Sequence, residues 1–444
     1  MSTQKIIDAH PTKEFFISML VRDIGLKYAI GDLVDNCIDG AKRLRGADNY
    51  ENLFIKLTIN ENEFIIEDNC GGIDLTTAEK YAFRFGRPSE MGTTQYSIGQ
   101  FGIGMKRALF KIGNKFTIDT NTLTNSFSMD VNVNEWKYEA DWIFNFNQIN
   151  EDANNAVENT GTKITITELH EDIKNSFLDP SFISQLKEEI EYQNLYNINK
   201  KISISINNSE LTSKKLNLKV SDNFKVGKWD KKFENDVEVK IIVGIGDDDK
   251  NLCGWYIFCN DRLIIGANQS KLTGWGDGVA KYHGQYDRFR GFVFFKAEDS
   301  SKLPWNTTKT GMNEDLPIFK TVRQKMIEMM KPVINGLLNP LKQENESSYI
   351  GSKILQKSIS EAITVNFATK DISSYVSDSG LFMHPVPDNV HSKVPNGENR
   401  ITYFKPTKEI NQLKKILGVS SVKEVGERTF EYTYNNEVDG ESYE

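Results

Sequence analysis

The stretch IGQFGIGMKRALFKIG, residues 98–113, combines closely spaced glycines with a helix-like segment that carries Lys106 and Arg107. Glycine loses much conformational freedom on folding, so such a cluster needs a structural reason. One reason is a tight turn, and another is a backbone that approaches a phosphate closely and presents its amides and a helix N-terminus. The order Gly-x-x-Gly-x-Gly reverses the dinucleotide fingerprint and lacks the Gly-Lys-Ser/Thr of a Walker A loop. Taken alone, the cluster leaves both readings open.

A second stretch, GDLVDNCIDGAKR at residues 31–43, has the period of an amphipathic helix. Asp32, Asn36, Asp39 and Gly40 fall at i, i+4, i+7 and i+8, so they share one face. Two carboxylates and an amide on one face suit Mg²⁺, which prefers oxygen ligands beside phosphates. The alternative is a solvated polar stripe. Apolar residues cover the rest of this helix, however, and buried carboxylates without a function are uncommon.

Two strand-like stretches carry further polar residues. In IIEDNCGGID, residues 65–74, a strand runs into Asp68 and then into Gly71 and Gly72. A carboxylate there can accept a hydrogen bond from an adenine amino group, and an Asx turn is the ordinary alternative. In TGTKITITEL, Thr162 follows Gly161 at the start of an alternating strand, which alone is unremarkable.

Hydrophobic periodicity predicts an α+β fold, because helices and strands do not alternate as they do in a parallel sheet. The expected helices span 15–44, 105–113, 183–194, 318–341 and 409–418. The expected strands span 52–60, 63–69, 115–122, 126–134, 162–169, 201–207, 237–246, 254–265 and 290–298. The pattern of expected helices and strands changes near residue 176. We therefore expect an α/β sandwich at 1–175, a second α/β domain at 176–345 and a C-terminal region at 346–444 that could bind a partner.

Composition narrows the class of protein. The chain has 444 residues, of which 39% are hydrophobic and 26% charged, as in ordinary soluble proteins. The absence of a membrane-length apolar run and of a signal-peptide core predicts a cytoplasmic protein without a membrane partner. Four cysteines without a Cys-x-x-Cys pair favour reduced structural thiols over zinc. The net charge of −8 argues against broad non-specific nucleic-acid binding, although a local basic patch stays open.

Together, in this order, the four stretches resemble the GHKL ATPase superfamily, which includes the gyrase B subunit, the ninety-kilodalton heat-shock chaperones, MutL and the MORC proteins. The resemblance covers residues 10–175. GQFGIG and GTKITI look most like the chaperones, DLVDNCIDGA looks more like MutL and MORC, and the whole is closest to a prokaryotic MORC-like ATPase. The resemblance implies the Bergerat α/β sandwich as the fold and ATP with Mg²⁺ as the cofactors.

The resemblance also implies roles for individual residues. It places adenine on Asp68, with Gly72 and Thr162 at the adenine end, and Mg²⁺ on Asn36, with Asp39 beside it. Asp32 would orient the attacking water. The lid that wraps the phosphates would consist of Gly99, Gln100, Phe101, Gly102, Ile103 and Gly104. Lys106 would add charge near the β- and γ-phosphates, with a solvated lysine as the alternative.

Two departures from the family pattern stand out. The family has Glu where this chain has Asp32, and the shorter side chain leaves its reach to the water open. The adenine motif Asp-x-Gly-x-Gly has Cys70 at its first glycine, while Gly72 keeps the second. We expect a locally altered turn that still binds adenine.

The following region resembles a MORC-type transducer in CNDRLI, residues 259–264, and SSKLPWNTTKTGMNED, residues 300–315. The resemblance implies that Lys309 reaches the γ-phosphate, and an ordinary surface lysine is the alternative. The expected function is a Mg-ATP-hydrolysing, ATP-dependent homodimer that clamps or remodels a client, either DNA or protein. Because of Asp32, a non-hydrolysing scaffold is an alternative. A histidine kinase is another, and His10 is the one histidine that precedes these motifs.

Overall fold

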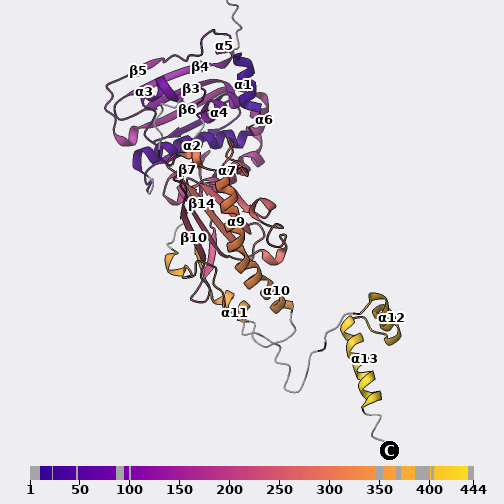
Figure 1. The fold of residues 1–444 in the computed structure, drawn as a ribbon. Helices are drawn as coiled ribbons and strands as arrows, with labels where there is room; N and C mark the ends of the chain where they lie inside the picture. Colours follow the sequence, from indigo (N-terminus) through magenta and orange to yellow (C-terminus); the bar gives the residue numbers. More distant parts are fainter. Residues whose placement is uncertain are drawn as a thin grey trace, which may run out of the picture. The chain divides into compact units, whose positions relative to one another are not determined.

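The computed structural model describes residues 11–22, 24–46, 49–86, 95–99, 102–346, 354–366, 372–385, 401 and 405–438. The chain forms two compact units, residues 1–385 and 386–444 (Figure 1). The predicted division at residues 175 and 345 stays a prediction. Among the described residues, no helix combines the length and apolar character that a membrane crossing requires.

The first sheet has eight strands in the order β5-β4-β3-β6-β2-β1-β7-β8. Their bounds are β1 Phe54–Ile59, β2 Phe64–Asp68, β3 Gly113–Asn121, β4 Ser126–Asn132, β5 Gln148–Asn150, β6 Gly161–Leu169, β7 Ser203–Ile206 and β8 Ser209–Glu210. All neighbours are antiparallel except β1 and β7. The strand pair 65–68 and 55–58 alternates as the sequence predicts, since Ile55 and Leu57 face the core while Lys56 is exposed.

Helices pack on this sheet and complete the sandwich (Figure 1). The helices of this part are α1 Lys13–Arg22, α2 Leu26–Arg45, α3 Leu75–Thr77, α4 Gly104–Ile112, α5 Val133–Trp136 and α6 Glu171–Leu178. The single helix expected at 15–44 is thus two helices, α1 and α2. α4 contacts α1, α2, β3 and β6, so it lies at the centre of this layer. Leu33, Val34 and Ile38 of α2 are buried in the core. The polar face of the helix therefore points away from these apolar contacts. The predicted α+β class is confirmed.

The second sheet has five strands in the order β10-β11-β14-β12-β13. Their bounds are β10 Gly227–Lys232, β11 Glu238–Ile245, β12 Gly254–Cys259, β13 Arg262–Asn268 and β14 Phe289–Lys296. The helices of this part are α7 Pro180–Gln193, α8 Leu195–Asn199, α9 Pro317–Lys331, α10 Asn339–Glu346 and α11 Ile354–Glu361, and β9 Asn217–Val220 pairs with β15 Ile363–Asn366. α9 packs on β11 and α7 on β13. We call residues 227–346 the second-sheet region.

Two details of this region differ from the prediction. The single strand expected at 254–265 is a hairpin, because Asn260 and Asp261 take left-handed φ angles of 47° and 69°. Asn and Asp accept that conformation more readily than other side chains do. The long helix expected at 318–341 becomes a π-helix at Pro332–Leu338, where Pro332 has no N–H to continue the α-helical pattern.

The C-terminal unit contains α12 Thr407–Leu417 and α13 Val422–Glu437. α12 confirms the helix predicted at 409–418. Gly418 ends it with a left-handed φ of 64°, and Ser421 starts α13 with a capping box to Glu424. α13 was not predicted.

Candidate functional site

A cavity of about 1050 Å³ lies between α2, the ends of β2 and β6, and the start of α4. It collects the predicted site residues that the structure describes: Asp32, Asn36, Asp39, Asp68, Gly72, Gly99, Gly102, Ile103, Gly104, Lys106, Thr162 and Lys309. Gln100 and Phe101 lie outside the described residues. The residues that carry the predicted chemistry therefore converge on one cavity.

The Asp68 end of the cavity is shaped by a tight turn. The Oδ1 of Asp68 accepts a hydrogen bond of 2.7 Å from the N–H of Cys70, which is the Asx geometry that the sequence left open. Burial raises the pKa of Asp68, although the hydrogen bond from Cys70 opposes the rise. Gly72 has φ 73°, and a Cβ there would stand 2.2 Å from the backbone O of Asn121. The turn therefore requires glycine at this position.

Thr162 lines the neighbouring wall of the cavity, and Thr120 supports it from behind. The hydroxyls of Thr162 and Thr120 lie 3.3 Å apart, and Thr120 also accepts the N–H of Ile73 at 2.8 Å. β6 thus delivers Thr162 beside the turn after Asp68, since the two residues are register partners.

The described part of the glycine-rich segment is anchored on α2. The carboxylate of Asp39 accepts the N–H groups of Ile98 and Gly99, each at 2.7 Å. A Cβ at Gly99 would lie 3.1 Å from the Oδ2 of Asp39, and a Cβ at Gly104 would lie 3.0 Å from the Oδ2 of Asp32. The glycines therefore let this backbone close tightly on the carboxylates of α2. In this arrangement both oxygens of Asp39 accept hydrogen bonds from the backbone.

Asp32 is buried between two cations. Its Oδ2 lies 2.7 Å from Nη2 of Arg107, and its Oδ1 lies 2.9 Å from Nζ of Lys309. Burial alone would raise the pKa of Asp32, but Lys309 and Arg107 outweigh burial and lower it. Asp32 is therefore ionised, and both of its oxygens are engaged.

Asp35 completes this ion-pair network, and we did not single it out from the sequence. Its side chain is fully buried, with Oδ2 at 2.8 Å from Nζ of Lys309 and Oδ1 at 2.8 Å from Nε of Arg262. The spacing from Asp32 to Asp35, three residues on a helix, was the available signal. Arg262 stands inside the quoted stretch CNDRLI, but nothing in that stretch indicates a partner on α2.

The lysine loop, residues 303–316, carries Lys309 into the cavity from the second-sheet region. Lys309 is 6% exposed, so the surface-lysine alternative is wrong. Burial alone would lower the pKa of Lys309. The nearby carboxylates of Asp32 and Asp35 outweigh burial, so the pKa lies above its ordinary value. Lys309 therefore stays charged between two carboxylates of α2.

Lys106 is also buried, and the solvated-lysine alternative is wrong for it as well. Its Nζ donates a hydrogen bond of 2.8 Å to the backbone O of Ala82. Burial lowers the pKa of Lys106 to about 7. A nearby anion would favour its charged form.

Two observations fit a phosphate ligand and Mg²⁺ in this cavity. The buried Nε–H of Arg107, a residue that lines the cavity, has no acceptor among the described residues. Asn36 supplies an amide oxygen from the same face of α2, although no group of three His, Cys, Asp or Glu among the described residues could hold a metal. Mg²⁺ commonly binds through one or two protein oxygens together with phosphates and waters, so Asn36 fits as its protein ligand.

The hairpin turn between β12 and β13 contacts the residues that precede the glycine-rich segment. Asn260 is buried, and its Nδ2 donates to the backbone O of Ser97 at 3.0 Å. Tyr96 N donates to the backbone O of Glu298 at 3.1 Å, and Lys42 of α2 donates to Tyr96 O at 2.8 Å. Residues 96–99 are thus held between α2 and the second-sheet region.

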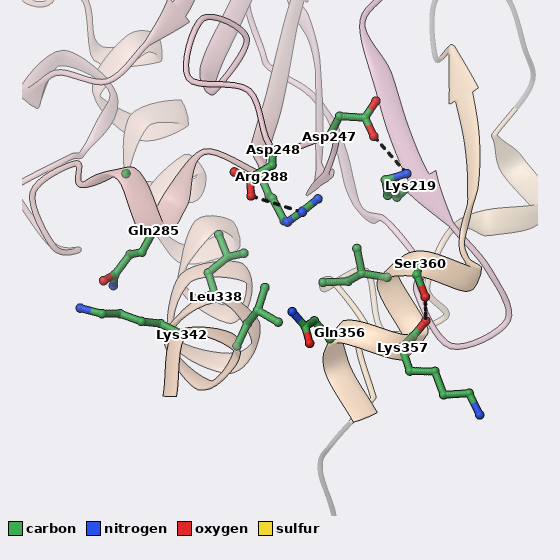
Figure 2. A pocket seen from close by; sticks show the side chains of 13 residues that line it. Lys219, Asp247, Asp248, Gln285, Arg288, Leu338, Lys342, Gln356, Lys357 and Ser360 are labelled. Atoms are coloured by element: carbon green, nitrogen blue, oxygen red, sulfur yellow. Dashed lines mark hydrogen bonds and ion pairs between the residues drawn. The ribbon is translucent and has the colours of Figure 1, made fainter. Parts of the chain in front are cut away.

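A second cavity of about 980 Å³ lies within the second-sheet region and against α11 (Figure 2). Four of its charged side chains form two ion pairs, Lys219 with Asp247 at 3.0 Å and Arg288 with Asp248 at 3.3 Å. None of the predicted site residues lines it. The chemistry therefore gathers in the first cavity.

Comparison with known families agrees with this geometry. Residues 24–172 match the family described as histidine kinase-, DNA gyrase B-, and HSP90-like ATPase. No curated protein matches the chain significantly. The matched residues contain α2, the turn after Asp68, α4 and β6, whereas Arg262 and Lys309 lie beyond them.

Proposed function

We propose that this protein binds and hydrolyses Mg-ATP and works as a nucleotide-gated switch, because residues 24–172 match the histidine kinase-, DNA gyrase B-, and HSP90-like ATPase family. Asp68, Gly72 and Thr162 would hold the adenine end, and Asn36 would supply the protein ligand to Mg²⁺. Bound Mg²⁺ would neutralise phosphate charge. The lid, Gly99 to Gly104, would cover the phosphates with its amides, and Lys106 would add a positive charge beside them.

One observation carries the proposal. Lys309, which stands 277 residues beyond Asp32, reaches α2 from the second-sheet region and forms ion pairs of 2.9 Å with Asp32 and 2.8 Å with Asp35. A triphosphate in the cavity would compete with these carboxylates for the ammonium group. A ligand shifts a conformational equilibrium by its differential affinity for the two states. Whether Lys309 pairs with the carboxylates or with a phosphate would therefore couple the nucleotide state to the second-sheet region.

Hydrolysis places a demand on Asp32. A carboxylate that orients the attacking water needs a free oxygen, and both oxygens of Asp32 are occupied in this structure. We propose that Lys309 leaves Asp32 when ATP binds and thereby frees one oxygen. General-base assistance of this kind typically contributes about 10²- to 10⁴-fold in rate.

The same occupancy of Asp32 favours a second candidate, a non-hydrolysing nucleotide-gated scaffold. Calorimetric titration of Mg-ATP and steady-state phosphate release separate the two. The proposed enzyme binds ATP and releases phosphate above the level of the Asp68→Asn variant. A scaffold binds ATP without such release. Absence of both binding and release in the folded wild-type protein refutes both candidates.

We further propose that ATP drives homodimerisation and that the closed dimer clamps or remodels a client, DNA or protein. Light scattering of the protein with and without a non-hydrolysable ATP analogue tests the dimer, and an unchanged mass refutes it. A pull-down with a slowly hydrolysing variant addresses the client. The histidine kinase alternative depends on His10, which lies outside the described residues, and radiolabelled ATP would label the chain if it held.

A further inference from the structure

Arg262 stands at the first position of β13, and its guanidinium joins three separate parts of the fold. Nε donates to Oδ1 of Asp35 at 2.8 Å, Nη1 donates to the backbone O of Lys309 at 3.1 Å, and Nη2 donates to Oε1 of Gln193 at 3.0 Å. The residue is only 1% exposed. These contacts tie α2, the lysine loop and the end of α7 to one planar group. A planar fork of fixed donors is suited to holding several acceptors at defined angles.

The backbone of Lys309 needs such support. Lys309 has a left-handed φ of 54°, a conformation that is unfavourable for a residue with a Cβ. Asn306 shapes the loop from inside, since its backbone O accepts Lys309 N–H at 3.0 Å and its side chain accepts Thr310 N–H at 2.9 Å. Arg262 holds the carbonyl of Lys309 itself. A strained backbone conformation persists only where its surroundings fix it in this way.

The charges in the network are balanced through Arg262. Two carboxylates, Asp32 and Asp35, face Lys309, while Arg107 pairs with Asp32 and Arg262 pairs with Asp35. Because each carboxylate has its own arginine, neither is left as an unpaired buried charge if Lys309 moves. An uncompensated buried charge is strongly unfavourable.

We propose that Arg262 is a positioning residue that aims Lys309 into the cavity and leaves it free to exchange partners. The guanidinium fixes the Lys309 carbonyl, and its bond to Asp35 removes the need for Lys309 to stay there. The inference rests on the proposed function, because the exchange matters only if a nucleotide occupies the cavity. The inference adds Arg262, a residue outside the matched residues 24–172, which controls when Lys309 can leave Asp35.

Three variants test this role. Arg262→Lys keeps the charge but loses the fork, and Asp35→Asn keeps the shape but loses the charge with which both Arg262 and Lys309 pair. Gln193→Met is the matched control, because it removes one buried partner of Arg262 without touching the contacts to Asp35 and Lys309. Each variant is prepared as the full chain, and its thermal unfolding is recorded so that loss of stability is scored separately.

The first readout needs no nucleotide. Acetylation of Lys309 by an amine-reactive reagent is followed by mass spectrometry, with unmodified protein as the reference. We expect Arg262→Lys to expose Lys309 severalfold faster than the wild-type protein and than Gln193→Met. Asp35→Asn removes an ion-pair partner of Lys309 itself and gives the upper reference rate. Equal rates in Arg262→Lys and Gln193→Met would overturn the proposal. If Arg262→Lys does not fold, Arg262→Gln against Gln193→Met decides in the same way.

The second readout is the split between kcat and KM for ATP. We expect Arg262→Lys to lower kcat about 10- to 100-fold, because misplacement of a catalytic charge by about 1 Å has effects of that size, with little change in KM. A parallel loss in Gln193→Met would assign Arg262 a merely structural role and overturn the proposal. If the wild-type protein neither binds nor hydrolyses ATP, the proposed function fails, while the acetylation of Lys309 still decides what Arg262 does.

Discussion

Lys106 provides a quantitative test, because its burial has a calculable consequence for stability. Its pKa falls from the ordinary 10.5 to about 7, and desolvation is the cause. At pH 7.5 the amine is largely neutral in the folded chain and charged in the unfolded chain. Deprotonation about three pH units below the ordinary pKa costs roughly 4 kcal/mol at about 1.4 kcal/mol per unit. Lys106→Met removes that cost.

The substitution has a cost of its own. Methionine is of similar length but cannot donate to the backbone O of Ala82, which accepts from Lys106 at 2.8 Å. A buried acceptor without its donor costs about 1–3 kcal/mol. We therefore expect Lys106→Met to raise the free energy of unfolding by about 2 kcal/mol at pH 7.5, the difference between the two.

The sign of the pH dependence follows from the depressed pKa. Between about pH 7 and 10.5 the unfolded chain binds more protons at this site than the folded chain, so the free energy of unfolding rises with pH in the wild-type protein. The free-energy cost of burying Lys106 is fully present below about pH 7 and absent above about pH 10.5. The advantage of Lys106→Met should therefore have disappeared at about pH 9.5.

Urea unfolding at pH 7.5 and 9.5, followed by circular dichroism, measures both quantities. Lys111→Met, in the same helix, controls for loss of a lysine from α4. A Lys106→Met variant that is less stable than the wild-type protein at pH 7.5, or a difference that is equal at both pH values, refutes the reasoning. The expected result would mean that the chain tolerates a destabilising lysine in the wall of this cavity.

Three further predictions concern the proposed roles in the cavity. Asp68→Asn presents an amide donor to the adenine amino group, so calorimetry should show ATP affinity lower by about 10- to 100-fold, and unchanged affinity would remove Asp68 from the site. Asn36→Ala should abolish the dependence of ATP binding on Mg²⁺ and preserve the far-ultraviolet spectrum, whereas normal phosphate release would show that the metal assignment is wrong. Asp32→Asn should keep ATP binding and lose about 10²-fold or more in phosphate release; turnover at the wild-type rate would mean that another group activates the water.

Local sequence patterns predicted most of the fold. Alternation of buried and more exposed residues in β1, β2 and much of β6 and the apolar stripe of α2 are signals that a short window of sequence contains. The elements that changed depend on single residues inside a continuous pattern. Asn260 and Asp261 turned one predicted strand into a hairpin, and Pro332 turned part of a predicted helix into a π-helix.

For the candidate site, the sequence predicted residues that lie in local motifs but missed contacts between residues that are distant in the sequence. The motifs brought Asp32, Asn36 and Asp68 together because each has a recognisable local setting. The pairing of Asp35 with Arg262 joins residues separated by 227 positions. Only the docking of the second-sheet region on α2 creates that contact, and no local pattern encodes it. The role of Asp39 as an anchor for Ile98 and Gly99 was missed because the bonded residues stand 59 and 60 positions apart in the sequence.

Hydrogen–deuterium exchange of the lysine loop with and without Mg-ATP tests the central claim most directly, since the claim is that Lys309 passes the nucleotide state to the second-sheet region. The loop amides include Lys309 N–H, bonded to Asn306 O at 3.0 Å, and Asn306 N–H, bonded to Gly311 O at 2.9 Å. The account predicts that saturating Mg-ATP changes exchange in residues 303–316 of the wild-type protein and leaves it unchanged in Asp68→Asn. Identical exchange in this loop with and without ATP, in a wild-type protein shown by calorimetry to be saturated, would contradict it.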